Sequence, residues 1–461
     1  MSKVKINIED IFEIPTAEIF NPDGFNVINA VSIDSRNIPP RAIFVAIKGK
    51  KFDGHNFIGD AVTNGAEVIM VNKNQLNKTE HLDLPIVAVK NTTIALGDLA
   101  RIWRSKLQTK IIGITGSAGK TSTKEILAAL LSSKYKVNKT LANNNNHIGV
   151  PLTLFSTNNN HDVLVLELGT NHFGEIPYTA NIGLPDYGII TNIGDSHLEF
   201  FDNRKGVYKE KIELFKAIDS IGGTVFVNND DKLLSKATKF KNVITYGFNS
   251  DSDVKGKIVN YDEEGKPNIE IRYNNRSYNF TLPLAGEQNA KNFLAAAAVV
   301  LKIDLSQEEI EKGLQKLKAY DKRLNIKRFK DVILIDDTYN ANPESMRSSI
   351  ELLSKIQTKE KKIAVLGDMF ELGVNGKKLH ENLSKVIKKN KIDSVYTIGS
   401  LMKNLYYKLK ESKIETRHFI SRSSLNKFLA EKDFSNSAVL VKGSRGMKME
   451  EFVKVLEDRL K

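Results

Sequence analysis

The segment "GITGSAGKTSTKEI" (residues 113–126) has the residue types of a phosphate-binding loop. The β-branched run "KII" before it predicts a strand, and the apolar residues of "TSTKEILAALLSS" after it recur at helical spacing. Glycines at such a junction let backbone N–H groups face phosphate oxygens, while Lys120 can reach the β- and γ-phosphates and Thr121 can bind Mg²⁺. The usual pattern has a glycine where this chain has Ile114. A nucleotide site is therefore the first hypothesis, and a tight turn followed by a lysine is the alternative.

Length and composition are those of an ordinary globular protein. A chain of 461 residues with 41% hydrophobic and 27% charged residues predicts about three domains. The apolar runs are too short to cross a bilayer, and the N-terminal "MSKVKINIEDIFEI" lacks the apolar centre of a signal peptide. We therefore expect a cytoplasmic protein without membrane insertion. A monomer is also expected, although no sequence pattern bears on the oligomeric state. The lack of cysteine excludes disulfides, thiolate catalysis and cysteine-bound metals.

The net charge is +13, with a pI near 9.3. Such a balance can mark a nucleic-acid-binding protein. Here the lysines are spread along the chain without a basic tail, and runs such as "KVIKKNKI" are typical of solvated helix ends and loops. The charge therefore favours an anionic small substrate over nucleic acid.

The chain divides into three blocks. Residues 1–108 hold short strands such as "AIFVAI" and "EVIMV". Residues 109–322 alternate strands with helices, as parallel α/β sheets do, with an antiparallel patch at 253–283. Residues 323–461 form a second alternating array that has no glycine-rich phosphate motif. The pattern predicts an α/β fold of three domains.

Polar residues follow two strands of the middle block. Glu167 ends "VLVLELG", while Asp195, His197 and Glu199 follow "GIITNIG". Ligands of open parallel sheets gather at the carboxyl ends of the strands, where the glycine loop also lies, and a carboxylate there can hold Mg²⁺. The alternatives are a capping or solvated acid for Glu167 and ordinary polar surface for His197.

Motifs spread along the whole chain resemble the Mur ligase family. They are "TGSAGKTSTKE", "NNNNHIGVPLTL", "ELGTNHFGEI", "GEQNAKNFLAAAA", "IDDTYNANPESM", "LGDMFELG" and "VKGSRGMKME". The N-terminal "SIDSRNIPPRAIFVAIKGKKFDGHNFIGDAVTNGA" resembles the uridine-nucleotide-binding domain of that family. The resemblance implies a UDP-muramoyl substrate-binding domain (1–108), a central P-loop ATP-binding ligase domain (109–322) and a Rossmann-like domain that binds an incoming dipeptide (323–461).

The resemblance also implies an activity in peptidoglycan precursor synthesis, in the cytoplasm. ATP would phosphorylate the terminal carboxylate of a UDP-N-acetylmuramoyl tripeptide. The amine of D-alanyl-D-alanine would then attack the acyl phosphate, releasing ADP and phosphate. Phosphoryl transfer to a carboxylate brings negative charges together, so a lysine and two Mg²⁺ ions would offset the repulsion.

Site residues follow from the matched motifs. The catalytic residues implied are Lys120, Glu167, His197 and Lys211. The metal ligands implied are Thr121, Glu167, His197 and a carbamylated Lys211. The ATP contacts implied are Gly116, Ser117, Gly119, Lys120, Thr121, Ser122, Asn289, Asn292, Arg323 and Asp337. The substrate contacts implied are Asp34, Ser35, Arg36, Asp53, Gly54 and His55 on the uridine side, Asn145 and Asn146 in a substrate loop, and Tyr339, Asn340, Asn342 and Ser345 toward the dipeptide.

Three structural expectations accompany these assignments. A site built from two domains should close about a hinge near residues 320–325. The segment "NANPES" should start a helix, with Asn342 as its cap and Pro343 in its first turn. Lys211 should be shielded from water with a lowered pKa, because carbamylation needs a neutral amine. From the residues alone, Lys209, Lys211 and Lys216 are alike.

Other functions stay open at this stage. A sister enzyme, either another Mur ligase or folylpolyglutamate synthetase, shares the P-loop ligase architecture. A P-loop switch or motor would hydrolyse ATP without an acyl acceptor. A nucleic-acid-binding protein would bind with a strong dependence on salt.

Overall fold

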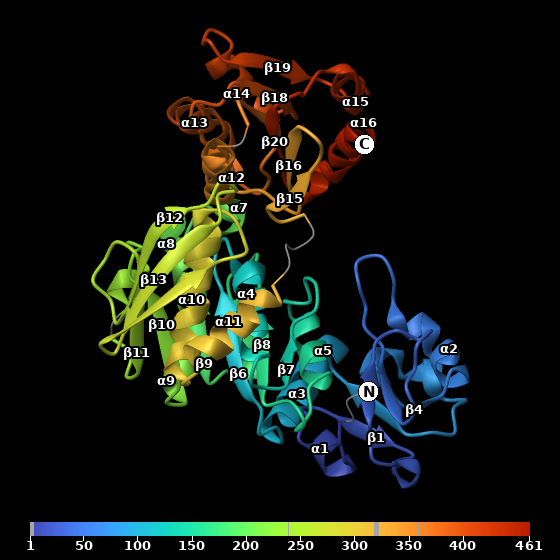
Figure 1. Cartoon of the computed structure of the whole chain (residues 1–461). Helices are drawn as coiled ribbons and strands as arrows, with labels where there is room; N and C mark the ends of the chain where they lie inside the picture. The colour runs from blue at the N-terminus through green and yellow to red at the C-terminus, as the bar shows by residue number, and fades with distance from the viewer. Residues whose placement is uncertain (1–3, 238, 318–321, 358) are drawn as a thin grey trace.

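The computed structural model describes residues 4–237, 239–317, 322–357 and 359–461 as three α/β domains, each built on one sheet (Figure 1). The blue N-terminal domain lies beside the lower part of the central domain, and the orange-to-red C-terminal domain lies above it. The three-domain α/β fold predicted from the sequence is confirmed. No helix in these described ranges is long and apolar enough to cross a membrane.

The N-terminal sheet is parallel except for its edge pair, β1 with β5. In sheet order its strands are β1 (Glu18–Phe20), β5 (Ile86–Val89), β4 (Ala66–Asn72), β3 (Ala42–Val45) and β2 (Ala30–Ser32). Its helices are α1 (Ile8–Phe12), α2 (Ile58–Thr63) and α3 (Thr92–Ser105), with 3₁₀ turns η1 (Pro22–Gly24), η2 (Gly54–Phe57) and η3 (Lys73–Thr79).

The central sheet has nine strands and carries helices on both faces. In sheet order the strands are β14 (Arg276–Thr281), β13 (Pro267–Tyr273), β12 (Val254–Tyr261), β11 (Val243–Gly247), β10 (Thr224–Asn228), β9 (Tyr187–Ile190), β6 (Lys110–Thr115), β8 (Val163–Glu167) and β7 (Val137–Lys139). The helices are α4 (Lys120–Leu131), α5 (Gly149–Phe155), α6 (Glu175–Gly183), α7 (Leu198–Phe201), α8 (Arg204–Lys211), α9 (Glu213–Ser220), α10 (Glu287–Lys302) and α11 (Gln307–Gln315), with the 3₁₀ turn η4 (Leu234–Lys236). The antiparallel patch expected at 253–283 is present as β12–β14, and it extends the same sheet because β12 pairs in parallel with β11.

Strand β8 shows how the two faces of this sheet are filled. All five of its residues are buried, as expected for a parallel strand covered on both sides. Side chains alternate between the faces of a strand. Val163 and Val165 join a core with α4 and α10, whereas Leu164 and Leu166 join a second core with α3, α5 and α6. The alanine-rich middle of α10 is fully buried in the first of these cores.

The N-terminal and central domains share that second core. Helix α3 packs against α5 and α6, and one continuous apolar cluster extends from Val4 to Ala237. The C-terminal domain has two apolar clusters that lie almost wholly within its own residues. The first two domains are therefore joined by apolar packing, while the third is a more separate unit.

The C-terminal sheet is parallel except for its first pair, β15 with β16. In sheet order its strands are β15 (Asn325–Arg328), β16 (Val332–Asp337), β20 (Ser437–Lys442), β17 (Lys361–Gly367), β18 (Ser394–Ile398) and β19 (Glu415–Phe419). Its helices are α12 (Pro343–Lys355), α13 (Gly376–Lys389), α14 (Met402–Leu409), α15 (Arg422–Glu431) and α16 (Glu450–Leu460), with 3₁₀ turns η5 (Gly373–Asn375) and η6 (Arg445–Met447). The predicted helix start is confirmed: Asn342 caps α12 by accepting the Ser345 N–H at 2.9 Å, and Pro343 is in the first turn.

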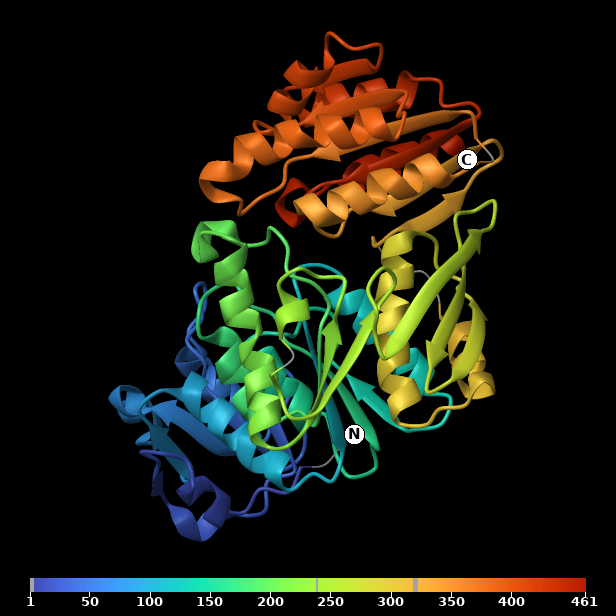
Figure 2. The same cartoon turned by 90° about the vertical axis from the view of Figure 1, so that its left-hand side faces the viewer.

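Polar contacts join the C-terminal domain to the central one. Arg204 binds Asp195 through two nitrogens, at 2.7 and 2.8 Å, and also reaches Glu344 of α12 at 2.5 Å. In Figure 2, α12 faces the top of the central domain across this junction. The hinge expected near 320–325 falls partly on residues 318–321, which lie outside the described residues. Just beyond them, Lys322 and Leu324 have positive φ angles, which non-glycine residues rarely adopt.

Candidate active site

The glycine loop links β6 to α4 in a conformation that requires its glycines. Gly116 and Gly119 have φ angles of +150° and +83°. A Cβ atom on Gly119 would lie 2.4 Å from the side-chain oxygen of Asn292. Ile114, at the position where the usual motif has glycine, lies in the buried part of β6 instead. The loop therefore bends at Gly116 and opens at the N-terminus of α4, which is the geometry for binding an anion.

Lys120 begins α4 and folds back over the loop. Its Nζ donates to the carbonyl of Gly116 at 2.9 Å. Burial lowers the pKa of Lys120, Glu167 opposes that shift, and Arg323 adds to it. The ammonium group is thus held at the loop, beside one carboxylate and one further cation.

Glu167 lies at the carboxyl end of β8, and its carboxylate is almost fully buried. Oε1 accepts hydrogen bonds from Thr121 at 3.2 Å and from Asn145 at 2.9 Å. Oε2 has no hydrogen-bond partner among the described residues, although Lys124 Nζ is 3.6 Å away. A buried carboxylate oxygen without a hydrogen bond, next to the Thr121 hydroxyl, is a donor set that suits a hard cation such as Mg²⁺.

His197 and Lys211 differ from Glu167 in their surroundings. His197 precedes α7, and its Nδ1 lies 2.6 Å from Oε2 of Glu371 in the C-terminal domain, as a charge contact rather than an aligned hydrogen bond. That contact lowers the pKa of Glu371. Lys211 is 1% exposed, and burial, reinforced by Lys120, holds its pKa well below the usual value. The expected shielding of Lys211 is therefore observed, whereas Lys209 on the same helix is exposed.

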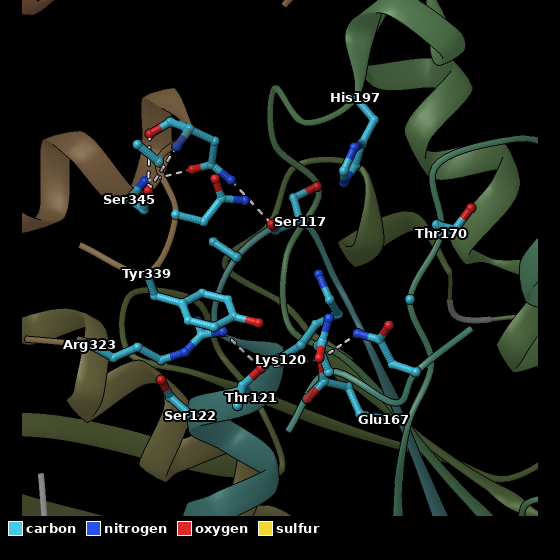
Figure 3. A pocket seen from close by; sticks show the side chains of 18 of the residues that line it. Ser117, Lys120, Thr121, Ser122, Glu167, Thr170, His197, Arg323, Tyr339 and Ser345 are labelled. Carbon is cyan, nitrogen blue, oxygen red and sulfur yellow. Dashed lines mark hydrogen bonds between the residues drawn. The ribbon is translucent and has the colours of Figure 1, made fainter. Parts of the chain in front are cut away.

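The C-terminal domain reaches the glycine loop through two side chains. Arg323 donates to the Thr121 hydroxyl at 3.2 Å, and its guanidinium stacks 3.8 Å from the ring centre of Tyr339. Asn342 donates to the carbonyl of Ser117 at 3.2 Å. Figure 3 shows Arg323 and Tyr339 on one side of the loop and Glu167 on the other. The site is therefore assembled from two domains.

A carboxylate of the C-terminal domain, that of Asp337, also lines the cavity. Asp337 ends β16 and pairs with the buried Lys442 at 2.5 Å. Ser349 of α12 donates to the same oxygen at 2.6 Å. These contacts fix the orientation of the carboxylate at the rim of the cavity.

These groups line one cavity of about 720 Å³. Of the residues assigned from the sequence, it brings together Ser117, Gly119, Lys120, Thr121, Ser122, Asn145, Asn146, Glu167, His197, Asn289, Asn292, Arg323, Asp337, Tyr339, Asn340, Asn342 and Ser345. Gly116 lies beneath Lys120, and Lys211 is buried close to it, so both adjoin the cavity without lining it. Within the described part of the chain, no three His, Asp or Glu side chains lie close enough together to hold a metal ion. A full metal site therefore needs other donors.

The six residues assigned to the uridine side lie in the N-terminal domain and do not line this cavity. Arg36 binds Asp34 through two nitrogens and lowers the pKa of that carboxyl to about 2. His55 is fully buried, with Nδ1 2.6 Å from Asp53 and Nε2 accepting the N–H of Asn72. The imidazole of His55 therefore stabilises its own turn in this conformation.

Sequence reasoning left many residues that line the cavity unassigned. Six of them have ionisable side chains: Lys50 from the N-terminal domain, His147, His172, Glu175, Glu371 and Lys442. Of these, Lys50 lies in a basic turn, "KGKK", which could have indicated that it binds an anion. Glu371 and Lys442 belong to motifs quoted above, "LGDMFELG" and "VKGSRGMKME", but no role followed from them.

Comparison with known proteins agrees with this arrangement. Family models match along the chain as the Mur ligase family catalytic domain (27–104), the Mur ligase middle domain (114–300) and the Mur ligase glutamate ligase domain (322–445). The chain is 34% identical over 457 residues, 98% of each protein, to the UDP-N-acetylmuramoyl-tripeptide–D-alanyl-D-alanine ligase of Bacillus subtilis. A crystal structure of MurF from Acinetobacter baumannii superposes with a TM-score of 0.90, at 29% identity over 99% of this chain and 100% of that one. MurF of Thermotoga maritima in complex with ADP superposes with a TM-score of 0.82, at 30% identity over 94% and 97%.

Replacing Lys120 tests the loop directly. Lys120→Ala should lower kcat for nucleotide-dependent turnover by ~10²-fold or more, because the ammonium is placed where charge develops on transferred phosphate. Its melting temperature should stay close to that of the wild type. The control is Lys136→Ala, which removes an exposed lysine near the end of α4. Near-normal turnover in Lys120→Ala would show that the loop does not bind phosphate.

Closure of the C-terminal domain is a second prediction. Since Arg323 and Asn342 contact the loop from that domain, an ATP analogue with Mg²⁺ should reduce the radius of gyration in X-ray scattering. Arg204→Met should show a smaller reduction, because it loses the contact with Glu344. Lys216→Met, which removes an ion pair within one helix, is the control. Identical scattering with and without nucleotide contradicts closure.

Proposed function

The chain belongs to the Mur ligase family, and we propose that it is the member that joins D-alanyl-D-alanine to a UDP-N-acetylmuramoyl tripeptide at the expense of ATP. The tripeptide carboxylate is first phosphorylated to an acyl phosphate, and the dipeptide amine then displaces phosphate to form an amide. This is an ATP-dependent peptide ligase reaction of peptidoglycan precursor synthesis. ATP and uridine nucleotides are cytoplasmic metabolites, so the proposal includes a cytoplasmic location.

One observation carries the proposal: a single cavity joins a phosphate loop to side chains of another domain. Arg323 donates to the Thr121 hydroxyl, and the Lys120 ammonium lies at the Gly116 carbonyl of the same loop. Phosphoryl transfer depends mainly on positioning and on cations around the transferred group. Two fixed cations beside the loop meet that requirement, and Arg323 does so only when the two domains are together.

The remaining nucleotide contacts are assigned by position. Asn289 and Asn292 of α10 line the cavity on what would be the adenine side. Asn289 donates to the carbonyl of Ala285 at 2.8 Å, and Asn292 accepts from Gln288 at 3.1 Å, so both amides are held in place. Asp337, fixed by Lys442, would accept hydrogen bonds from the ribose.

The donors around Glu167 fit Mg²⁺. The Thr121 hydroxyl and the Glu167 carboxylate would hold one ion, which when bound would neutralise charge on the ATP phosphates. For a second ion, we assign Glu167, His197 and Lys211. Lys211 supplies an oxygen ligand only as a carbamate, formed when its neutral amine adds to the carbon of carbon dioxide and releases one proton. The burial and the lowered pKa of Lys211 support that step.

Substrates are assigned to the two outer domains. The uridine nucleotide would bind the N-terminal domain near Asp34, Ser35 and Arg36 and near the Asp53–His55 turn. Lys50 of that domain lines the central cavity, which supports a substrate that extends from one domain to the other. The dipeptide would meet the acyl phosphate from the side of Tyr339, Asn340, Asn342 and Ser345.

Phosphate release measures the proposed reaction. With ATP and Mg²⁺, release should be slow alone and with either substrate singly, and should rise at least ~10²-fold when muramoyl tripeptide and D-alanyl-D-alanine are both present. Mass spectrometry should show one new pentapeptide product per phosphate. Acceptor-independent hydrolysis at full rate would instead indicate a P-loop switch. Turnover with glutamate and a folate, but not with D-alanyl-D-alanine, would indicate a folylpolyglutamate synthetase.

Lys211 has its own test. Lys211→Ala should lose ~10²-fold or more of the activity and regain part of it with a short carboxylate, which can occupy the vacated ligand position. Wild-type protein in ¹³C-labelled bicarbonate should show a carbamate carbon signal that Lys211→Ala lacks. Lys209→Ala, which removes an exposed lysine of the same helix, should behave as wild type. Equal activities of the two variants would mean that Lys211 is not a ligand.

A further inference from the structure

A second pocket, of about 200 Å³, adjoins the first cavity. Its inner end is shared with that cavity through Lys120, His197 and Glu371. Its outer end is formed by Phe370 and by residues 444–446 of the "VKGSRGMKME" segment, to which no function has been assigned above. A molecule in this pocket would have one end at the phosphate loop and the other against the C-terminal domain.

The pocket is small, and part of its wall is apolar. The backbone of Gly446 is so close to Phe370 that a Cβ atom there would lie 2.7 Å from the ring. Leu372 and Ala341 add buried apolar surface. A volume of about 200 Å³ is also below the roughly 300–1,000 Å³ of pockets for drug-sized ligands. Short side chains such as methyl groups suit these walls.

Charged side chains line both ends of this pocket. Among the described residues that line the outer end, Arg445 is the one cation, and the acid there, Asp195, is already bound by Arg204. At the inner end, Glu371 is the one carboxylate among the shared lining residues, beside the ammonium group of Lys120 and the imidazole of His197, which already contacts it. A small zwitterion whose carboxylate meets Arg445 would therefore have its ammonium group inward, near Glu371.

Arg445 is held in place, and part of its guanidinium group remains available to bind a ligand. It begins η6, and its backbone N–H donates to Asn340 Oδ1 at 3.1 Å. Of its guanidinium nitrogens, Nη1 donates to Glu450 at 3.1 Å, and Nε and Nη2 have no hydrogen-bond acceptor in the described ranges. The side chain is 58% exposed. A guanidinium has five N–H donors in a fork that matches a carboxylate, so the free side of Arg445 can bind one.

We propose that Arg445 binds the C-terminal carboxylate of the incoming D-alanyl-D-alanine and so directs its amine toward the phosphate loop. This inference rests on the proposed function and adds the residue that selects a dipeptide with a free carboxylate. The methyl groups lie against Phe370 and Leu372, and the amine lies at the inner end, near Glu371, where it meets the activated carbonyl group.

Pairing a side-chain change with a substrate change tests this contact. Arg445→Met should raise the KM for D-alanyl-D-alanine roughly 10- to 100-fold, the range for a hydrogen bond to a charged group, with the KM values for ATP and tripeptide unchanged. D-alanyl-D-alaninamide, which lacks the carboxylate, should be a similarly poor substrate for the wild type and no poorer for Arg445→Met. Arg445→Lys should recover part of the loss. Lys448→Met removes a neighbouring exposed cation and should behave as wild type.

Two outcomes overturn the proposal. One is an unchanged KM for the dipeptide in Arg445→Met; the other is an equal loss with the dipeptide and its amide, which would mean that Arg445 acts without contacting the carboxylate. Normal KM values for ATP and tripeptide establish that the variant is folded. Failure of the wild type to use any D-alanyl-D-alanine is a different result, since it refutes the proposed function itself.

Discussion

The carboxylate of Glu167 is buried at the end of β8, and much of the site is arranged around it. An isolated buried carboxylate costs several kcal/mol, so its neighbours must compensate it. Parallel pairing of β8 with β6 sets Glu167 opposite Ile114, directly before the glycine loop. The Thr121 hydroxyl and the Asn145 amide then donate to one oxygen, while the other stays free of hydrogen bonds. The register of two strands thus places this carboxylate beside the glycine loop.

The three domains are packed together in different ways. The N-terminal and central domains share one apolar core, which holds them together through the burial of α3. Apart from a few apolar contacts, such as that of Ala285, the C-terminal domain meets the central one through ion pairs and hydrogen bonds, such as that of Asn342 with Ser117. Exposed and half-exposed polar contacts contribute little free energy each, so such a junction is compatible with the domain closure predicted above.

Three buried lysines show how tertiary position sets the role of a residue type. Lys124 donates to the carbonyl of Thr140 at 2.7 Å and lies near Glu167, and Lys442 pairs with Asp337. Both hold loops and carboxylates in place. Lys211 is instead buried near Lys120, and its pKa falls well below the usual value. The ammonium groups of Lys124 and Lys442 thus stabilise the surrounding structure, whereas that of Lys211 is a candidate for chemical modification.

The sequence by itself determined the features that depend on neighbours along the chain. Apolar alternation and the glycines of residues 113–126 sufficed for the strands, the P-loop and the three-domain α/β fold, and Asn342 and Pro343 sufficed for the start of α12. Local pattern could not predict that Lys211 is buried while Lys209 is exposed, or that His55 is buried within its own turn. Burial depends on which elements pack over a side chain. The tertiary structure alone decided that Lys50, Glu371 and Arg445 lie at the cavities. The physical reason is that these residues meet the phosphate loop only through the packing of separate domains, which no spacing along the chain encodes.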